Sequence, residues 1–108
     1  MIVATTETIA GMSVVKTLGL VQGSSIRARH LGEDLIATLK NLTGGEITGY
    51  TKLMAEAREQ CLDRMREQAV SLGANAVLSL RFVTTEVMQG AAELVAYGTA
   101  VVIDEQQE

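Results

Sequence analysis

Several residue types that mark particular protein classes are scarce in this chain of 108 residues, which has no proline, no tryptophan and a single cysteine, Cys61. One cysteine excludes a disulfide within the chain. One phenylalanine and two tyrosines offer few stacking surfaces, and the net charge is -4. Because nucleic-acid-binding proteins rely on basic surfaces and stacking aromatic side chains, we expect no nucleic-acid partner.

Long apolar runs are absent as well. No stretch approaches the roughly 18 residues of a membrane-spanning helix. The N-terminal MIVATTETIAG has neither the basic start nor the apolar centre of a signal peptide. We therefore expect a soluble, cytoplasmic protein without membrane contact.

Apolar residues are nevertheless abundant, at 47% of the chain against 20% charged residues. A single domain of this size buries only about two-thirds of the surface that its unfolded chain exposes. Apolar surface is therefore left for a partner, and the simplest partner is another copy of the same chain.

Hydrophobic periodicity predicts the secondary structure. The expected elements are a β segment at 1–6, a strand or hairpin at 13–28, a helix at 32–42, a helix from 48 or 50 to 72, strands at 77–83 and 93–103, and a turn at 88–90. This order favours an α+β fold in which two helices pack on one face of a small antiparallel sheet. We expect one domain at 1–103 and a frayed polar tail at 104–108.

The side chains of each element divide into faces. The first helix has one face of leucines: Leu31, Leu35, Leu39 and Leu42. The second has an apolar stripe that ends at Gly73: Leu53, Met54, Ala57, Cys61, Met65, Ala69 and Leu72. Alternation places Leu78, Leu80 and Phe82 on one face of the first late strand, with Val77 and Val83 on the other. In the last strand one face holds Val95, Tyr97, Val101 and Ile103. Gly19 and Gly23 indicate a bulge, a bend or a close backbone contact.

The stretch TGGEITGYTK, at 43–52, has nearly the glycine spacing of a phosphate-binding loop. However, Tyr50 stands where the lysine belongs, Glu46 would repel phosphate, and a helix rather than a strand precedes the loop. The interpretation that fits is a connector between helices, with Thr48 or Thr51 as the N-cap. A small anionic ligand at the start of the second helix is the alternative. Its candidate residues are Gly44, Gly45, Tyr50 and Thr51.

Short motifs in a fixed order give a resemblance to a family. TGGEITGY, AREQ, LGANAV and YGTAVVI, together with TTETIAG and LGLVQG near the N-terminus, make the chain similar to the YbjQ-like family of small bacterial proteins, which carries a heavy-metal-binding label. The resemblance covers about residues 2–103. It implies a sheet with packed helices, built into a ring-shaped homopentamer, and a metal ion by label only. It implies no known reaction.

Two groups of residues have the spacing of metal ligands. Met54, Cys61 and Met65 share one helix face and could hold Cu(I) through soft donors, although such residues more often fill a core. His30, Glu33 and Asp34 have the spacing of a helical zinc or manganese site, although the two acids also suit the positive end of a helix dipole.

An acidic stripe lies along the second helix: Glu56, Glu59, Asp63 and Glu67. It could line a pore or attract cations, or form a solvated face paired with Lys52 and Arg66. No nucleophile has an evident base, and Cys61 has no histidine nearby, so no catalytic residue can be named.

We therefore expect a homo-oligomeric protein, a pentamer by resemblance, that binds a metal ion or small ligand or serves assembly. The alternatives are an enzyme with its site between subunits, and a scaffold for another protein.

Overall fold

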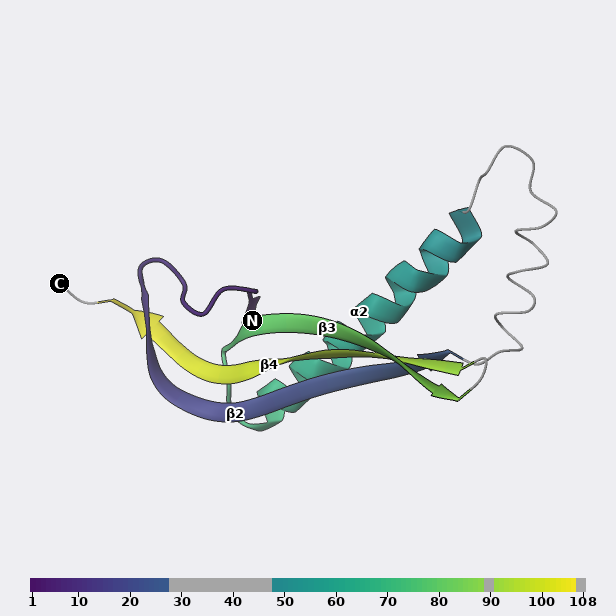
Figure 1. Cartoon of the computed structure of the whole chain (residues 1–108). Helices are drawn as coiled ribbons and strands as arrows, with labels where there is room; N and C mark the ends of the chain where they lie inside the picture. Colours follow the sequence, from purple (N-terminus) through teal and green to yellow (C-terminus); the bar gives the residue numbers. More distant parts are fainter. Residues whose placement is uncertain (28–47, 89–90, 107–108) are drawn as a thin grey trace.

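The computed structural model describes residues 1–27, 48–88 and 91–106. The elements are β1 (Ile2–Val3), β2 (Met12–Arg27), α2 (Thr48–Ser71), β3 (Ala76–Met88) and β4 (Ala91–Glu105). The strands form one sheet in the order β1-β3-β4-β2, and α2 crosses one of its faces (Figure 1). The α+β prediction is thus confirmed with one described helix. The helix predicted at 32–42 and most of the turn predicted at 88–90 lie outside the described residues.

The sheet is mixed rather than antiparallel. β4 pairs antiparallel with both β2 and β3, as expected for strands joined by short turns. β1 pairs parallel with β3, so the antiparallel prediction is wrong at this edge. Both β2 and α2 lie between β1 and β3 along the chain, so no hairpin constrains the relative direction of the two strands. Residues 12–27 form a single strand and not a hairpin.

Helix α2 packs on the sheet through a narrow row of mostly small side chains. Ala57, Cys61, Met65 and Ala69, each four residues apart, are fully buried, which confirms this part of the predicted stripe. The amide of Gly73 donates to Val70 O (2.9 Å) and that of Ala74 to Ala69 O (3.0 Å), with Gly73 at φ 89°. This is a Schellman motif, and it ends the helix before Leu72 can join the stripe. Leu72 is exposed, so its prediction is wrong.

A bulge in β3 overturns the predicted faces of that strand. Ser79 has φ 56°, and the pairing register with β4 shifts between Leu78 and Arg81. Because one extra residue reverses the alternation, Leu78 and Leu80 point to opposite faces. Leu80 packs against the core beneath α2, whereas Leu78 belongs to a second core on the other face. The predicted grouping of Leu78 with Leu80 and Phe82 is therefore wrong, and so is the grouping of Val77, which is buried beneath α2, with Val83.

The second core lies on the sheet face opposite α2. Its buried members are Ala76, Leu78, Val101 and Ile103. Ala4 and Ile9, in the segment between β1 and β2, and Met12 at the start of β2 pack against them. Backbone bonds from Ala4 N to Val77 O (2.9 Å) and from Leu80 N to Ala4 O (3.0 Å) hold this segment in place. Val101 and Ile103 share a face, as their alternation predicted.

Gly19 and Gly23 of β2 have the predicted roles, a bulge at the first and a close backbone contact at the second. Gly19 lies at a register shift, with φ 119°. A Cβ at Gly23 would overlap the carbonyl oxygen of Cys61 and come within 2.5 Å of the amide nitrogen of Met65. Gly23 therefore allows α2 to approach the strand backbone directly.

Candidate functional site

The soft-donor group on α2 lies in the core. Cys61 and Met65 are fully buried, and Met54 is half-buried. The Cys61 thiol donates a hydrogen bond to Leu94 O (3.2 Å). These residues share a helix face, as predicted, and this face is turned toward the sheet. A metal ion could reach all three donors only if α2 separated from the strands, so the arrangement does not fit a soft-metal site.

The structure describes only part of the other predicted ligand residues. His30, Glu33, Asp34, Gly44 and Gly45 lie outside the described residues. Tyr50 and Thr51 lie within α2, and only their backbone is described. Since α2 already includes Thr48, Thr51 is inside the helix, and its assignment as the N-cap is wrong.

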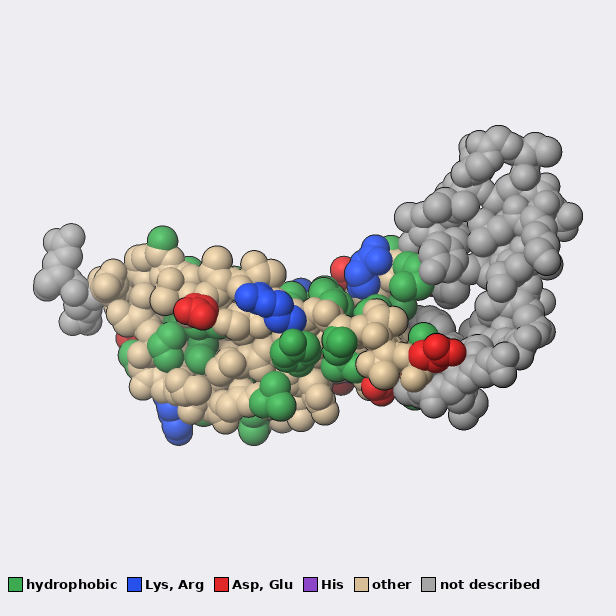
Figure 2. Space-filling view, in the orientation of Figure 1, with side chains coloured by type: hydrophobic (Ala, Val, Ile, Leu, Met, Phe, Trp, Pro, Cys, Tyr) green, Lys and Arg blue, Asp and Glu red, His purple; other side chains and the backbone are tan. Residues whose placement is uncertain are grey.

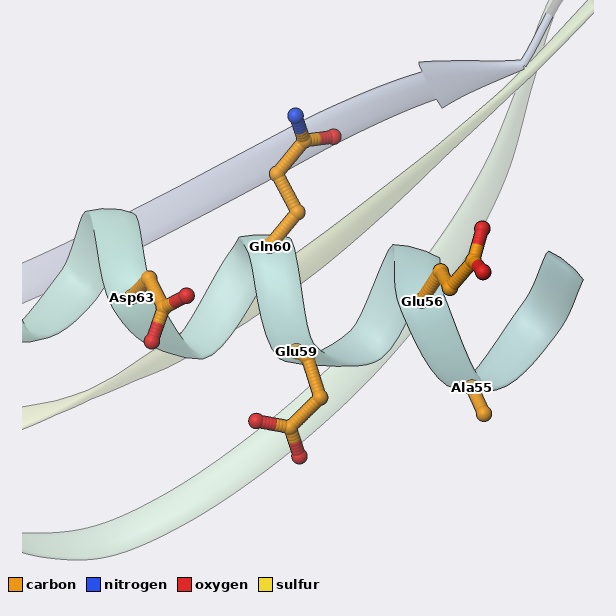
Figure 3. A pocket seen from close by; sticks show the side chains of 5 residues that line it. All are labelled: Ala55, Glu56, Glu59, Gln60 and Asp63. Carbon is orange, nitrogen blue, oxygen red and sulfur yellow. The ribbon is translucent and has the colours of Figure 1, made fainter. Parts of the chain in front are cut away.

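The acidic stripe of α2 is exposed along the helix. A shallow hollow of about 550 Å³ is lined by Ala55, Glu56, Glu59, Gln60 and Asp63. Figure 3 shows the three carboxylates of this hollow pointing in different directions rather than toward one point. Within residues 1–27, 48–88 and 91–106, no three His, Cys, Asp or Glu side chains are grouped closely enough to hold a metal ion. Arg66 pairs with Asp63 at 3.3 Å, as the sequence predicted.

A polar row beside the buried row of α2 closes one edge of the sheet. Gln68 Oε1 accepts a hydrogen bond from the amide of Gln22 at 2.7 Å, and Arg64 donates to the carbonyl of Ser24. One helical turn earlier, Ser25 donates to Gln60 (2.8 Å). β2 lies at the edge of the described sheet, and the contacts of Gln68 and Arg64 occupy two backbone groups that would otherwise be free to pair with another chain. Gln60, Arg64 and Gln68 are spaced by four residues, and this spacing is the signal of the polar row in the sequence.

Beyond the second core, the sheet face opposite α2 carries large exposed apolar side chains among polar ones such as Gln22, Ser24 and Arg81. The pairing register places Leu20 beside Thr99, Ile26 beside Glu93 and Val83 beside Val95, all on this face. Its exposed large side chains are Leu20 (67%), Ile26 (59%), Val83 (44%) and Tyr97 (38%). We call these four residues the outer patch. Figure 2 shows hydrophobic side chains at several places over the strands, among polar side chains and backbone, with a basic side chain close to them.

Comparison with known proteins places the chain in a family. A family model named YbjQ and described as "Putative heavy-metal-binding" matches residues 1–104. The chain belongs to the YbjQ family. A UPF0145 protein from Hahella chejuensis is 55% identical over 104 residues, which cover 96% of this chain and 100% of that protein. One from Thermosipho africanus is 48% identical over 108 residues and the full length of both chains.

The resemblance implied a bacterial family, but the YbjQ family also occurs outside bacteria. A UPF0145 protein from the archaeon Methanosarcina acetivorans is 54% identical over 103 residues, covering 95% of this chain and 97% of that protein. The fold also matches a crystal structure from Pediococcus pentosaceus, of a DUF74-family protein of unknown function. The TM-score is 0.62 at 18% identity, over 96% of this chain and 98% of that one. No helix in the described part of the chain has the length and apolarity to cross a membrane.

Proposed function

We propose that this YbjQ-family protein is a homo-oligomeric binding protein. Its copies join into a ring, a homopentamer as the resemblance implies, and the ring holds a metal ion or small ligand at the subunit boundaries or in its centre. The observation that carries the proposal is the outer patch, because soluble monomers rarely leave several large apolar side chains together on one sheet face.

The distribution of exposed apolar side chains supports a ring over a two-fold dimer. Besides the outer patch, Val70 and Leu72 are exposed at the C-terminal end of α2, on the other side of the sheet. A two-fold dimer needs one self-complementary surface, whereas a head-to-tail ring needs two different surfaces on each copy. Exposed apolar side chains outside the outer patch, which also include Val15 and Phe82, suit the second arrangement.

The accessible donors favour a hard cation as the ligand. Glu56, Glu59 and Asp63 present carboxylate oxygens to solvent, while Cys61 and Met65 are fully buried. Carboxylate oxygens bind Mg²⁺, Ca²⁺ or Mn²⁺ in preference to soft thiophilic metals. The three carboxylates of one chain point in different directions. A neighbouring copy therefore supplies the further ligands of the ion.

Native mass spectrometry of the protein purified without chelator, followed by titration with MnCl₂ or with Cu(I), tests both parts. We expect an oligomer that gains Mn²⁺ at a fixed stoichiometry and takes up no Cu(I). The double variant Glu59→Gln with Asp63→Asn should keep the oligomer and lose the metal, whereas Glu86→Gln, an exposed acid on β3, should keep both. A monomer would contradict the assembly, and an oligomer that binds no ion or small molecule would contradict the ligand.

A further inference from the structure

We infer that α2 takes the place of a neighbouring strand along residues 20–26 of β2 and thereby closes this edge to strand addition. The contacts that do so are made by the polar row of α2, which consists of Gln60, Arg64 and Gln68. The inference is independent of the proposed oligomer, and it gives α2 a role besides covering the core.

The main-chain groups that the polar row binds are those that point away from β4. In an antiparallel pair, the N–H and C=O of one residue point to the same side, and alternate residues point to opposite sides. The amide of Gln22 donates to Gln68 Oε1 at 2.7 Å and is therefore directed outward. Ser24, two residues later, has the same direction, and its carbonyl accepts a hydrogen bond from Arg64. A strand added to this part of the edge would need both groups.

The repeat of the helix matches the repeat of the strand. Four residues of an α-helix rise about 6 Å, and two residues of a strand rise about 6.7 Å. Successive turns of α2 can therefore reach successive outward groups of β2. Arg64 and Gln68 are one turn apart and bind residues 24 and 22, which are two apart. The glutamine amide supplies the acceptor, and the guanidinium the donor, that a strand would supply from its backbone.

Gly23 brings the helix near enough for these side chains to reach the edge. A Cβ at this position would come within 2.5 Å of the amide nitrogen of Met65 and 2.8 Å of the Cβ of Arg64. Because the helix backbone lies this close to the strand, the side chains of the polar row reach the main chain on both sides of Gly23.

The two halves of β2 differ in the protection that their own sequence provides. The first half contains Lys16 and two register shifts, and charges and bulges both hinder strand addition. From Leu20 to Ile26 the strand has no charged residue, no proline and an unbroken register with β4. An uncharged strand of this length is the kind of segment that pairs with other chains. The polar row lies along this unprotected half, and Arg64 adds a positive charge there.

Removing the hydrogen-bonding groups of the polar row tests the inference. The open variant, Arg64→Met with Gln68→Leu, keeps side chains of similar size that cannot bond to β2. The matched control, Arg64→Lys with Gln68→Glu, keeps a donor and an acceptor. Each double variant lowers the net charge by one, from -4 to -5. Arg64 and Gln68 are exposed, so circular dichroism should show that both double variants fold.

Hydrogen exchange of the Gln22 amide, followed by NMR, reports on the first contact by itself. We expect exchange to be roughly fivefold faster or more in Gln68→Leu, as for the loss of one hydrogen bond, and unchanged in Gln68→Glu. Equal exchange in Gln68→Leu and the wild type would overturn the inference, because the amide would then be protected by something other than α2.

A fluorescein-labelled peptide with the sequence of residues 18–27, LGLVQGSSIR, measures strand addition by fluorescence anisotropy. We expect the open variant to bind this peptide at least about tenfold more tightly than the wild type and the matched control do. Equal binding by all three proteins would show that the polar row does not close the edge. An open variant that binds no peptide would equally overturn the inference.

Discussion

Replacing Gly23 with alanine tests the packing of α2 on the sheet. The added Cβ would overlap the carbonyl oxygen of Cys61 and come within 2.5 Å of the amide nitrogen of Met65. Both are backbone atoms of the helix, so no side chain can rotate to make room. The helix must move away from β2, and this loosens the contact of Cys61, Met65 and Val21 in the core.

The magnitude follows from two opposing effects. Overpacking a core costs about 1–3 kcal/mol, and we expect the upper end because the obstacle is rigid backbone. Alanine also restricts the unfolded chain, which favours folding by about 0.5–1 kcal/mol. The overlap is the larger effect, and the net loss of stability should be about 2 kcal/mol. For a domain of this size, the loss corresponds to a fall in Tm of about 8–16 °C.

Thermal unfolding followed by circular dichroism at a fixed protein concentration measures this effect. Lys16→Ala is the control, since Lys16 is an exposed residue of the same strand outside the outer patch, and its replacement should change stability by less than about 0.5 kcal/mol. Gly23→Val should be worse than Gly23→Ala. A Gly23→Ala protein as stable as the wild type would refute the close approach of α2 to β2.

Two further predictions concern single side chains. Cys61→Ala removes the buried thiol and its hydrogen bond to Leu94 O. The free energy of unfolding, measured by urea denaturation, should fall by about 1–2 kcal/mol. The metal content, measured by plasma mass spectrometry, should not change. Loss of bound metal from a folded variant would restore Cys61 as a ligand. Asn75→Ala removes two hydrogen bonds to the backbone of Ile103, of 2.9 and 2.8 Å. The free energy of unfolding should fall by about 1–3 kcal/mol in the same assay. Wild-type stability would show that water replaces the amide.

Periodicity predicted the parts of the fold that depend on regular repeats. The buried row of α2 followed from a spacing of four, and Val101 and Ile103 were grouped correctly from a spacing of two. The roles of Gly19 and Gly23 were predictable because glycine in a strand indicates a bulge or a close approach. Asn75, within the LGANAV motif, joins the start of β3 to β4 through its side chain, a role that the motif alone did not reveal.

The errors arise where a local feature interrupts a repeat, or where distant parts of the chain determine the pairing. Ser79 adopts a positive φ that is uncommon for a residue other than glycine, and it reverses the faces of β3. Leu72 fits the helical period, but the cap at Gly73 ends the helix first. The parallel pairing of β1 depends on contacts between distant parts of the chain, which local patterns do not encode.

The candidate site was predicted less well than the fold, because helical spacing identifies a face but not its surroundings. Met54, Cys61 and Met65 were placed on one face correctly, yet the same spacing serves a core and a metal site. The outer patch was not predicted as a unit. Its residues come from three strands, and the β3 bulge determines which side chain of that strand faces outward.

The mass of the native protein in solution tests the central claim most directly. Size-exclusion chromatography with multi-angle light scattering, at micromolar concentration and without chelator, measures this mass independently of shape. The account predicts a discrete oligomer, five times the 11.5 kDa of one chain. A single species at 11.5 kDa would contradict the proposed ring.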